Sequence, residues 1–280
     1  MAYSTFSYAV ADHVAHIQLN RPDELNTMVL TFWQEMLDVF AEIETTPAVR
    51  TVVISSTGRH FTAGLDLKAF GAIQAEGKVD RARVAEQLRR SVLDMQESFN
   101  VIERCRAPVI AAIQGGCIGG GVDLISACDM RYCTADAFFC IQEINIGMVA
   151  DVGTLQRLPH LIPAGMVREM AYTGRRLPAE RAKAIGLVNE VYSSQAAMLD
   201  AVMATAREIA AKSPLAVHGT KDVLLYTRDH SVADGLNYIA VWNAGMLFSD
   251  DLVEQLQANR EKRPAKFAEL LPSKRLVKRR

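Results

Sequence analysis

Residues 107–128 read APVIAAIQGGCIGGGVDLISAC and place a strand, a glycine-rich turn and a helix in direct succession. The apolar run 108–113 predicts a buried strand, and the apolar positions of 122–127 predict a helix that starts directly after the glycines. Glycines allow positive φ and a close backbone approach to a ligand, and free N–H groups at a helix start favour a negative oxygen. No Gly-Lys-Ser/Thr follows, and the third glycine of a dinucleotide-binding loop is missing. We therefore expect either an oxyanion donor or a tight packing turn here, and not a phosphate loop.

Strands and helices alternate on either side of this stretch. Branched apolar residues at 14–19 and 51–55 predict strands, and apolar residues at three- and four-residue steps in 33–43 and 84–102 predict amphipathic helices. This order favours an α/β fold with buried, mainly parallel strands. From Gln195 onward, Ala-rich helical segments dominate. We expect an α/β core over residues 1–195 and a C-terminal helical region over residues 196–280.

The composition narrows the class of protein. The chain has 280 residues, 31 Lys and Arg against 32 Asp and Glu, a formal net charge of −1 and a mean hydropathy of +0.06. This balance argues against a nucleic-acid-coating protein and supplies enough apolar residues for a large core. No apolar run reaches the ~18 residues that would span a bilayer, and no secretory signal is recognised, so we expect a cytoplasmic protein. The five scattered cysteines predict neither a metal site nor disulfides, and we expect Cys117 to be a buried apolar filler.

Charged residues are sparse around the glycine turn. Asp123 is the sole charge between Ala107 and Cys128, and Glu143 and Asp151 are the only charges between Ala137 and Gln156. Burial without a cationic partner raises the pKa of a carboxyl group toward the range useful for acid–base catalysis. Three such acids together predict a proton-transfer site.

A second loop, FTAGLDL at residues 61–67, follows the strand at 51–55. Two backbone N–H donors from two such loops would stabilise an enolate oxygen. The chain contains no GxSxG or HExxH motif, which argues against a serine hydrolase and a zinc protease. We expect His60, next to this loop, to be an exposed turn residue.

In combination, these motifs resemble the enoyl-CoA hydratase/isomerase (crotonase) superfamily over most of the chain, and within it the dienoyl-CoA isomerases. The superfamily motifs are Asn20-Arg21-Pro22, 61–67, 118–123, Gly186-Leu187-Val188-Asn189 and a helical tail that ends in Lys262-Arg263-Pro264. The isomerase pattern comprises 119–133, 150–159, 212–214, 229–232 and 236–238.

The resemblance implies a crotonase-type ββα spiral core with a C-terminal helical trimerisation region, and a homotrimer or dimer of trimers. It implies an isomerase of fatty-acid β-oxidation that shifts 3,5-dienoyl-CoA to 2,4-dienoyl-CoA, with no cofactor beyond the CoA of the substrate. The N–H groups of Leu65 and Gly120 would form the oxyanion hole. Glu143 and Asp151 would transfer the protons, and Asp123 would be a third carboxylate. The substrate channel would be lined by Gly120 and by Thr62, Ala63, Gly64, Leu65 and Asp66.

Two alternatives remain. The first is hydration of 2-enoyl-CoA, with Asp123 and Glu143 holding a water; Asp151 argues against it, because hydratases commonly have an uncharged residue there.

The second is an RNA-binding member of the superfamily, because residues 260–280 carry nine Lys/Arg and two Glu, a charge of +7. Few aromatics accompany that charge, so nucleic acid is not expected as a partner. We expect a solvated terminus, and the resemblance implies that residues near 262–267 approach the CoA end of a neighbouring subunit's site.

Overall fold

A computed structural model of the chain describes residues 3–69 and 80–273. Its centre is a six-stranded sheet in the order β1-β2-β3-β4-β6-β9, in which β1 and β2 are antiparallel and the remaining neighbours are parallel. The strands are β1 (Phe6–Ala11), β2 (Val14–Leu19), β3 (Thr51–Ser56), β4 (Val109–Ile113), β6 (Met130–Thr134) and β9 (Glu190–Tyr192). The predicted α/β fold with mainly parallel strands is confirmed.

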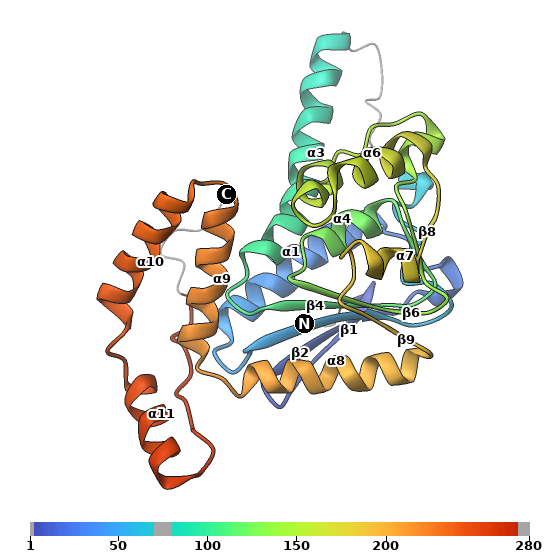
Figure 1. The fold of residues 1–280 in the computed structure, drawn as a ribbon. Coiled ribbons are helices and arrows are strands. Elements are labelled where there is room, and N and C mark those ends of the chain that lie inside the picture. Colours follow the sequence, from blue (N-terminus) through green and yellow to red (C-terminus); the bar gives the residue numbers. More distant parts are fainter. Residues whose placement is uncertain (1–2, 70–79, 274–280) are drawn as a thin grey trace.

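Helices cover both faces of this sheet (Figure 1). In β4, Val109, Ala111 and Ile113 face one hydrophobic core, while Ile110 and Ala112 face another. The first core is closed by α1 (Leu30–Thr45) and α3 (Arg81–Arg104), and the second by α8 (Gln195–Ala210). Because both sets of alternating side chains are buried, β4 consists of continuous apolar sequence.

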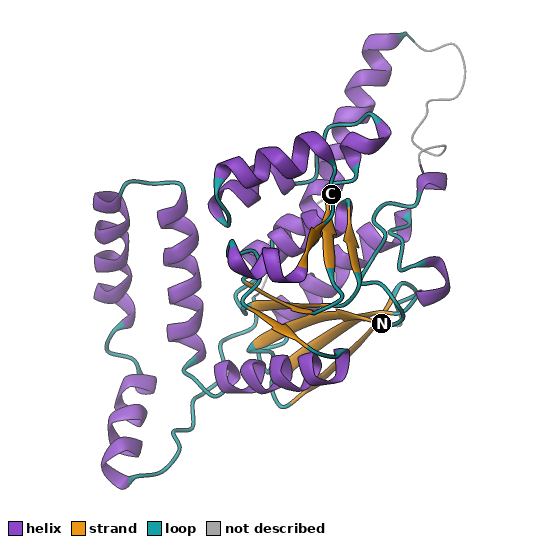
Figure 2. Cartoon of the chain, turned by 45° about the vertical axis from the view of Figure 1, so that its right-hand side comes forward, coloured by secondary structure: helices purple, strands orange, loops and turns teal. Residues whose placement is uncertain are grey.

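A smaller three-stranded sheet, β5-β7-β8, lies beside the first core and carries the glycine turn at its edge (Figure 2). Its strands are β5 (Gly116–Ile118), β7 (Phe138–Cys140) and β8 (Leu177–Pro178). The helices around it are α4 (Gly120–Ser126), α5 (Thr154–Arg157), α6 (Ala164–Thr173) and α7 (Ala179–Ala184). Short 3-10 turns are η1 (Pro22–Glu24), η2 (Leu67–Ala69), η3 (Glu143–Ile146) and η4 (Leu158–His160).

The C-terminal helices α9 (Pro214–Arg228), α10 (Val232–Met246) and α11 (Asp250–Glu261) extend away from both sheets (Figures 1 and 2). Ser213 caps α9, its hydroxyl accepting the N–H of Ala216. The division of the chain at residue 195 stays a prediction. It falls at the start of α8, whose residues pack on the sheet, so the helices that leave the core begin with α9.

The segment after α11 returns to the core. The Arg50 guanidinium donates to the carbonyl of Phe267 at 2.8 Å, and the Arg106 guanidinium donates to that of Leu271 at 3.0 Å. Arg263 pairs with Glu254 and Glu261. The basic tail up to residue 273 is therefore attached to the core and partly neutralised, while most of its residues remain exposed, as expected of a solvated terminus. The five cations of residues 274–280 lie outside the described residues.

No helix within the described residues combines the length and the apolar character that a membrane span requires. In the same part of the chain, no group of His, Cys, Asp and Glu side chains has the arrangement of a metal site. All five cysteines are buried free thiols. Burial raises the pKa of Cys117 well above its usual value, which agrees with its prediction as an apolar filler.

Candidate functional site

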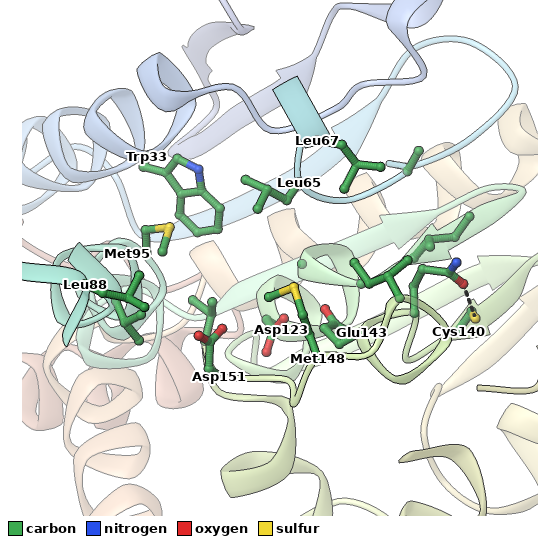
Figure 3. A pocket seen from close by; sticks show the side chains of 18 of the residues that line it. Trp33, Leu65, Leu67, Leu88, Met95, Asp123, Cys140, Glu143, Met148 and Asp151 are labelled. Atoms are coloured by element: carbon green, nitrogen blue, oxygen red, sulfur yellow. Dashed lines mark hydrogen bonds between the residues drawn. The ribbon is translucent and has the colours of Figure 1, made fainter. Parts of the chain in front are cut away.

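A cavity of about 620 Å³ lies between the glycine turn, α1, α3 and the loop that follows β7. Figure 3 shows Trp33, Leu88 and Met95 at one end of it, Leu67 and Cys140 at the other, and the carboxylates of Asp123, Glu143 and Asp151 between these ends. Leu65 and Met148 also line it, together with Ala63 and Gly120. Apart from the carboxylates, the cavity is mostly apolar, as expected of a site for a largely apolar ligand.

Two backbone N–H groups lie together in the wall of this cavity. Leu65 forms a parallel bridge with Met28, in which the N–H of Met28 donates to Gly64 and the N–H of Asp66 donates to Met28. In this pattern the N–H of Leu65 itself points away from the bridge. Gly120 is the first residue of α4, so its N–H has no partner within the helix. Among the residues described, neither N–H has a protein acceptor.

Glycine is required where the two loops meet. Gly64 has φ of +85°, and a Cβ on it would lie 2.7 Å from the carbonyl oxygen of Ile118 and 3.3 Å from the nitrogen of Gly120. A Cβ on Gly120 would lie 3.9 Å from the nitrogen of Leu65. The glycines therefore permit a close approach that brings both N–H groups beside one point of the cavity. Such a pair can stabilise an oxyanion.

Asp123 is the most deeply buried of the three acids, with a relative exposure of 1%. Its Oδ1 accepts the backbone N–H of Thr154 at 2.6 Å. Burial raises the pKa of Asp123 to about 6, although the bond to Thr154 opposes this rise. Asp123 can therefore exchange a proton near neutral pH.

Glu143 begins the η3 turn and reaches the glycine turn, because a Cβ on Gly119 would lie 3.1 Å from its Oε1. Burial, with the nearby charge of Asp123, raises the pKa of Glu143 to about 7. Burial also raises the pKa of Asp151, whose backbone carbonyl accepts from the Gln96 side chain at 2.6 Å. No ion pair within residues 3–69 and 80–273 involves any of the three acids. The three acids form an interacting set that can accept and donate protons.

The structure brings most of the predicted site residues together. Asp123, Glu143, Asp151, Leu65, Gly120 and Ala63 all line the cavity. Thr62, Gly64 and Asp66 are not among the lining residues of the described structure. The Thr62 hydroxyl donates to the carbonyl of Asn26 at 2.7 Å and accepts the N–H of Gly64, and the Asp66 carboxylate accepts the N–H of Lys68. These residues shape the loop from behind the cavity wall.

Other residues that line the cavity are not predicted as site residues by the sequence patterns. Trp33 and Met95 follow the helical period that predicts a core, and a period cannot distinguish a side chain that fills the core from one that lines a cavity. Arg176 lies over the ring of Phe138, 4.3 Å from its centroid, at the Cys140 end. His60 also differs from expectation: it is half-buried, and its Nδ1 accepts the N–H of Gly116 at 2.8 Å.

Comparisons with known proteins agree with this arrangement. A family model described as enoyl-CoA hydratase/isomerase matches residues 10–270. The chain is 52% identical to the human mitochondrial Delta(3,5)-Delta(2,4)-dienoyl-CoA isomerase, over 91% of this chain and 78% of that protein. It is 47% identical to the peroxisomal protein of the same name from Arabidopsis thaliana, over 92% of this chain and 93% of that protein.

Solved structures show the same fold. The crystal structure of an enoyl-CoA hydratase from Bacillus anthracis superposes with a TM-score of 0.85 at 31% identity, over 94% of this chain and 99% of that chain. The chain belongs to the enoyl-CoA hydratase/isomerase family, the crotonase superfamily.

Proposed function

We propose that the protein is an isomerase that shifts 3,5-dienoyl-CoA to 2,4-dienoyl-CoA. The observation that carries this proposal is the presence of Asp151 in one cavity with Glu143, Asp123 and two backbone N–H groups that have no acceptor among the described residues. The relatives named as dienoyl-CoA isomerases, at about half identity over most of the chain, support the same activity and its place in fatty-acid β-oxidation.

The proposed mechanism needs one oxyanion site and two proton carriers. The thioester oxygen accepts from the N–H groups of Leu65 and Gly120, which hold the negative charge of the dienolate. One carboxylate acts at C2 and another acts at C6, four carbons further along the conjugated chain. Loss of a proton from C2 gives the dienolate, and addition of a proton at C6 moves both double bonds and restores the thioester carbonyl.

We assign Glu143 to C2 and Asp151 to C6. Glu143 lies beside Gly119, next to the proposed oxyanion site, and C2 is the carbon attached to the thioester carbonyl. Asp151 lies nearer to Leu88 at the apolar end of the cavity, where the remainder of the acyl chain would extend (Figure 3). In addition to burial, the charge of Asp123 raises the pKa of Glu143, and the charge of Asp151 raises the pKa of Asp123. The reaction requires no cofactor, because CoA is part of the substrate.

A spectroscopic assay tests the activity. The purified protein is mixed with a 3,5-dienoyl-CoA, and the absorbance of the conjugated 2,4-dienoyl thioester is followed. We expect a rapid rise. The assay is repeated with a 2-enoyl-CoA, whose hydration removes absorbance, because the likeness to a solved hydratase makes hydration the second candidate. Rapid hydration without isomerisation would contradict the proposal.

The proposed assembly is a homotrimer or a dimer of trimers formed through the C-terminal helices. Large apolar side chains are exposed there, including Leu224, Val232, Leu236, Val241 and Phe248. Such a surface is expected to be covered by another copy of the chain. Sedimentation equilibrium would test this. The expected cytoplasmic location stays a prediction, since the names of the relatives specify mitochondria and peroxisomes.

A further inference from the structure

A row of polar side chains on α3 faces the loop that carries Asp151. Gln96, Asn100 and Glu103 follow the spacing i, i+4, i+7, which places them on one face of the helix. Gln96 donates to the backbone carbonyl of Asp151 at 2.6 Å. The other two contact Arg157, at the end of α5.

Arg157 holds the far end of the same loop. Its guanidinium donates to Asn100 Oδ1 at 2.6 Å and to Glu103 Oε1 at 3.3 Å. A Cβ on Gly153 would overlap this guanidinium, so Arg157 packs directly against the loop backbone. The next residue, Thr154, donates its N–H to Asp123. The backbone that holds Asp123 and Asp151 is therefore fixed from behind by α3.

Glu103 connects this arrangement to the C-terminal helices. Its carboxylate also pairs with Arg228, the last residue of α9. Burial alone would raise the pKa of Glu103, but its bonds to Arg228 and Arg157 bring the pKa below the usual value. One anion thus stays charged between two cations, one on the loop side and one on α9. A second cavity, of about 470 Å³, adjoins these groups and shares Val152 with the larger cavity.

We propose that Gln96, Asn100 and Glu103, with Arg157 and Arg228, form a positioning network that aligns Asp123 and Asp151 for proton transfer. Through this network, helix α9 of the C-terminal region contributes to the geometry of the active site. The inference rests on the proposed function, because it concerns the same two carboxylates. None of these five residues is assigned contact with the substrate.

Glu103→Gln and Arg228→Gln test the network, because each removes one charge and keeps most of the side-chain volume. We expect kcat for isomerisation to fall between about 10- and 100-fold, since small misplacements of catalytic groups have effects of this size. KM should stay within about twofold, because the cavity walls that would bind the acyl-CoA are unchanged. Arg228→Lys should recover most of the lost rate. Glu86→Gln, which breaks an exposed ion pair with Arg90 on the same helix, is the matched control and should behave as the wild type.

A second measurement separates positioning from stability. The side-chain carboxyls are titrated by ¹³C NMR in the wild type and in Arg157→Gln. The Arg157 charge lowers the pKa of Asp123, so its titration should move to higher pH in this variant. Unchanged kcat in both charge variants, with an unchanged Asp123 titration in Arg157→Gln, would overturn the network even if the melting temperature fell. If the wild type did not isomerise dienoyl-CoA, the proposed function would fail, while the titration would still decide whether the network acts on Asp123.

Discussion

Two aspartates near the same short helix have opposite surroundings. Asp123 lies within α4, faces the cavity and has one backbone N–H as its hydrogen-bond donor. Asp129 follows α4 on the other side, where its Oδ2 accepts from the Lys221 ammonium and from the N–H of Val109, each at 2.7 Å. Lys221 comes from α9 and is 6% exposed.

The difference shows how one residue type serves two purposes in this fold. The carboxylate of Asp129 has a cation and connects a C-terminal helix to the core. Within the described part of the chain the carboxylate of Asp123 has no ion-pair partner, and burial raises its pKa into the range of proton exchange. A partnered acid contributes to stability, and an unpartnered acid in a cavity contributes to chemistry at some expense of stability. Substitutions at the cavity acids should therefore change activity, and substitutions at the Asp129–Lys221 pair should change stability.

The largest effect on activity should come from a substitution among the cavity acids. Asp151→Asn removes a proton carrier and keeps the shape of the side chain, so isomerisation should fall about 10²- to 10⁴-fold. Binding of a saturated acyl-CoA should stay near the wild-type value, because the cavity walls and the two N–H donors are intact. Stopped-flow absorbance and calorimetry measure these two quantities. Asp200→Asn, on the exposed side of α8, is the control, and near-normal turnover in Asp151→Asn would refute the assigned role.

Activity should be nearly as sensitive to a change in the proposed oxyanion site. In Gly64→Ala, the new methyl group would meet the carbonyl of Ile118 at a backbone φ that disfavours alanine, so the loop must shift and move the N–H of Leu65. Loss of one such donor lowers kcat about 10²- to 10³-fold. Gly165→Ala is the matched control, since Gly165 has open space around it in α6. Equal activity of the two variants would argue against this loop as an oxyanion donor.

Loss of the Asp129–Lys221 ion pair should lower the stability of the fold and leave kcat unchanged. Lys221→Met keeps the aliphatic length but leaves Asp129 without its cation, and the carbonyls of Ile102 and Ala107 also lose a donor. Breaking a buried ion pair lowers the free energy of unfolding by about 3 kcal/mol or more. Because Asp129 is partly exposed, we expect a loss of about 2–3 kcal/mol. Urea unfolding measures this loss. Lys212→Met, at an exposed position, should change little, and kcat of the folded enzyme should be retained in both.

Much of this arrangement could be predicted from local sequence. The strand 14–19 and the helices around 33–43 and 84–102 are found where the sequence predicts them. The three acids of the charge-poor stretch 107–156 line one cavity, while their role in proton transfer stays a prediction. These features are local, so periodicity and charge spacing suffice to identify them.

The contacts that join distant segments were not predictable in this way. The apolar stripe of α8 predicts a buried face, but not that this face covers the second side of the large sheet. The family resemblance places Thr62 in the substrate channel, yet its hydroxyl donates to the carbonyl of Asn26, which belongs to a different loop. Asp129 and Glu103 each pair with a cation on α9, and nothing in the local sequence of either acid distinguishes it from an unpartnered acid.

The smallest expected effect is on the pH dependence of stability, where Asp123 and Asp129 can be compared directly. Burial raises the pKa of Asp123 from 3.8 to about 6, so ionisation in the folded state costs up to roughly 3 kcal/mol, at 1.36 kcal/mol for each pKa unit. For a raised carboxyl pKa, the associated stability is present at pH below 3.8 and is lost as the pH rises through about 6. Asp123→Asn should therefore stabilise the fold by about 1–3 kcal/mol at pH 8 and by little at pH 4, while Asp129→Asn should destabilise it at pH 8 by weakening the bond to Lys221. Urea unfolding of both variants at the two pH values measures this contrast. A loss of stability at pH 8 in Asp123→Asn would mean that its bond to Thr154 outweighs the penalty of burying the charge, and that the two aspartates are both structural.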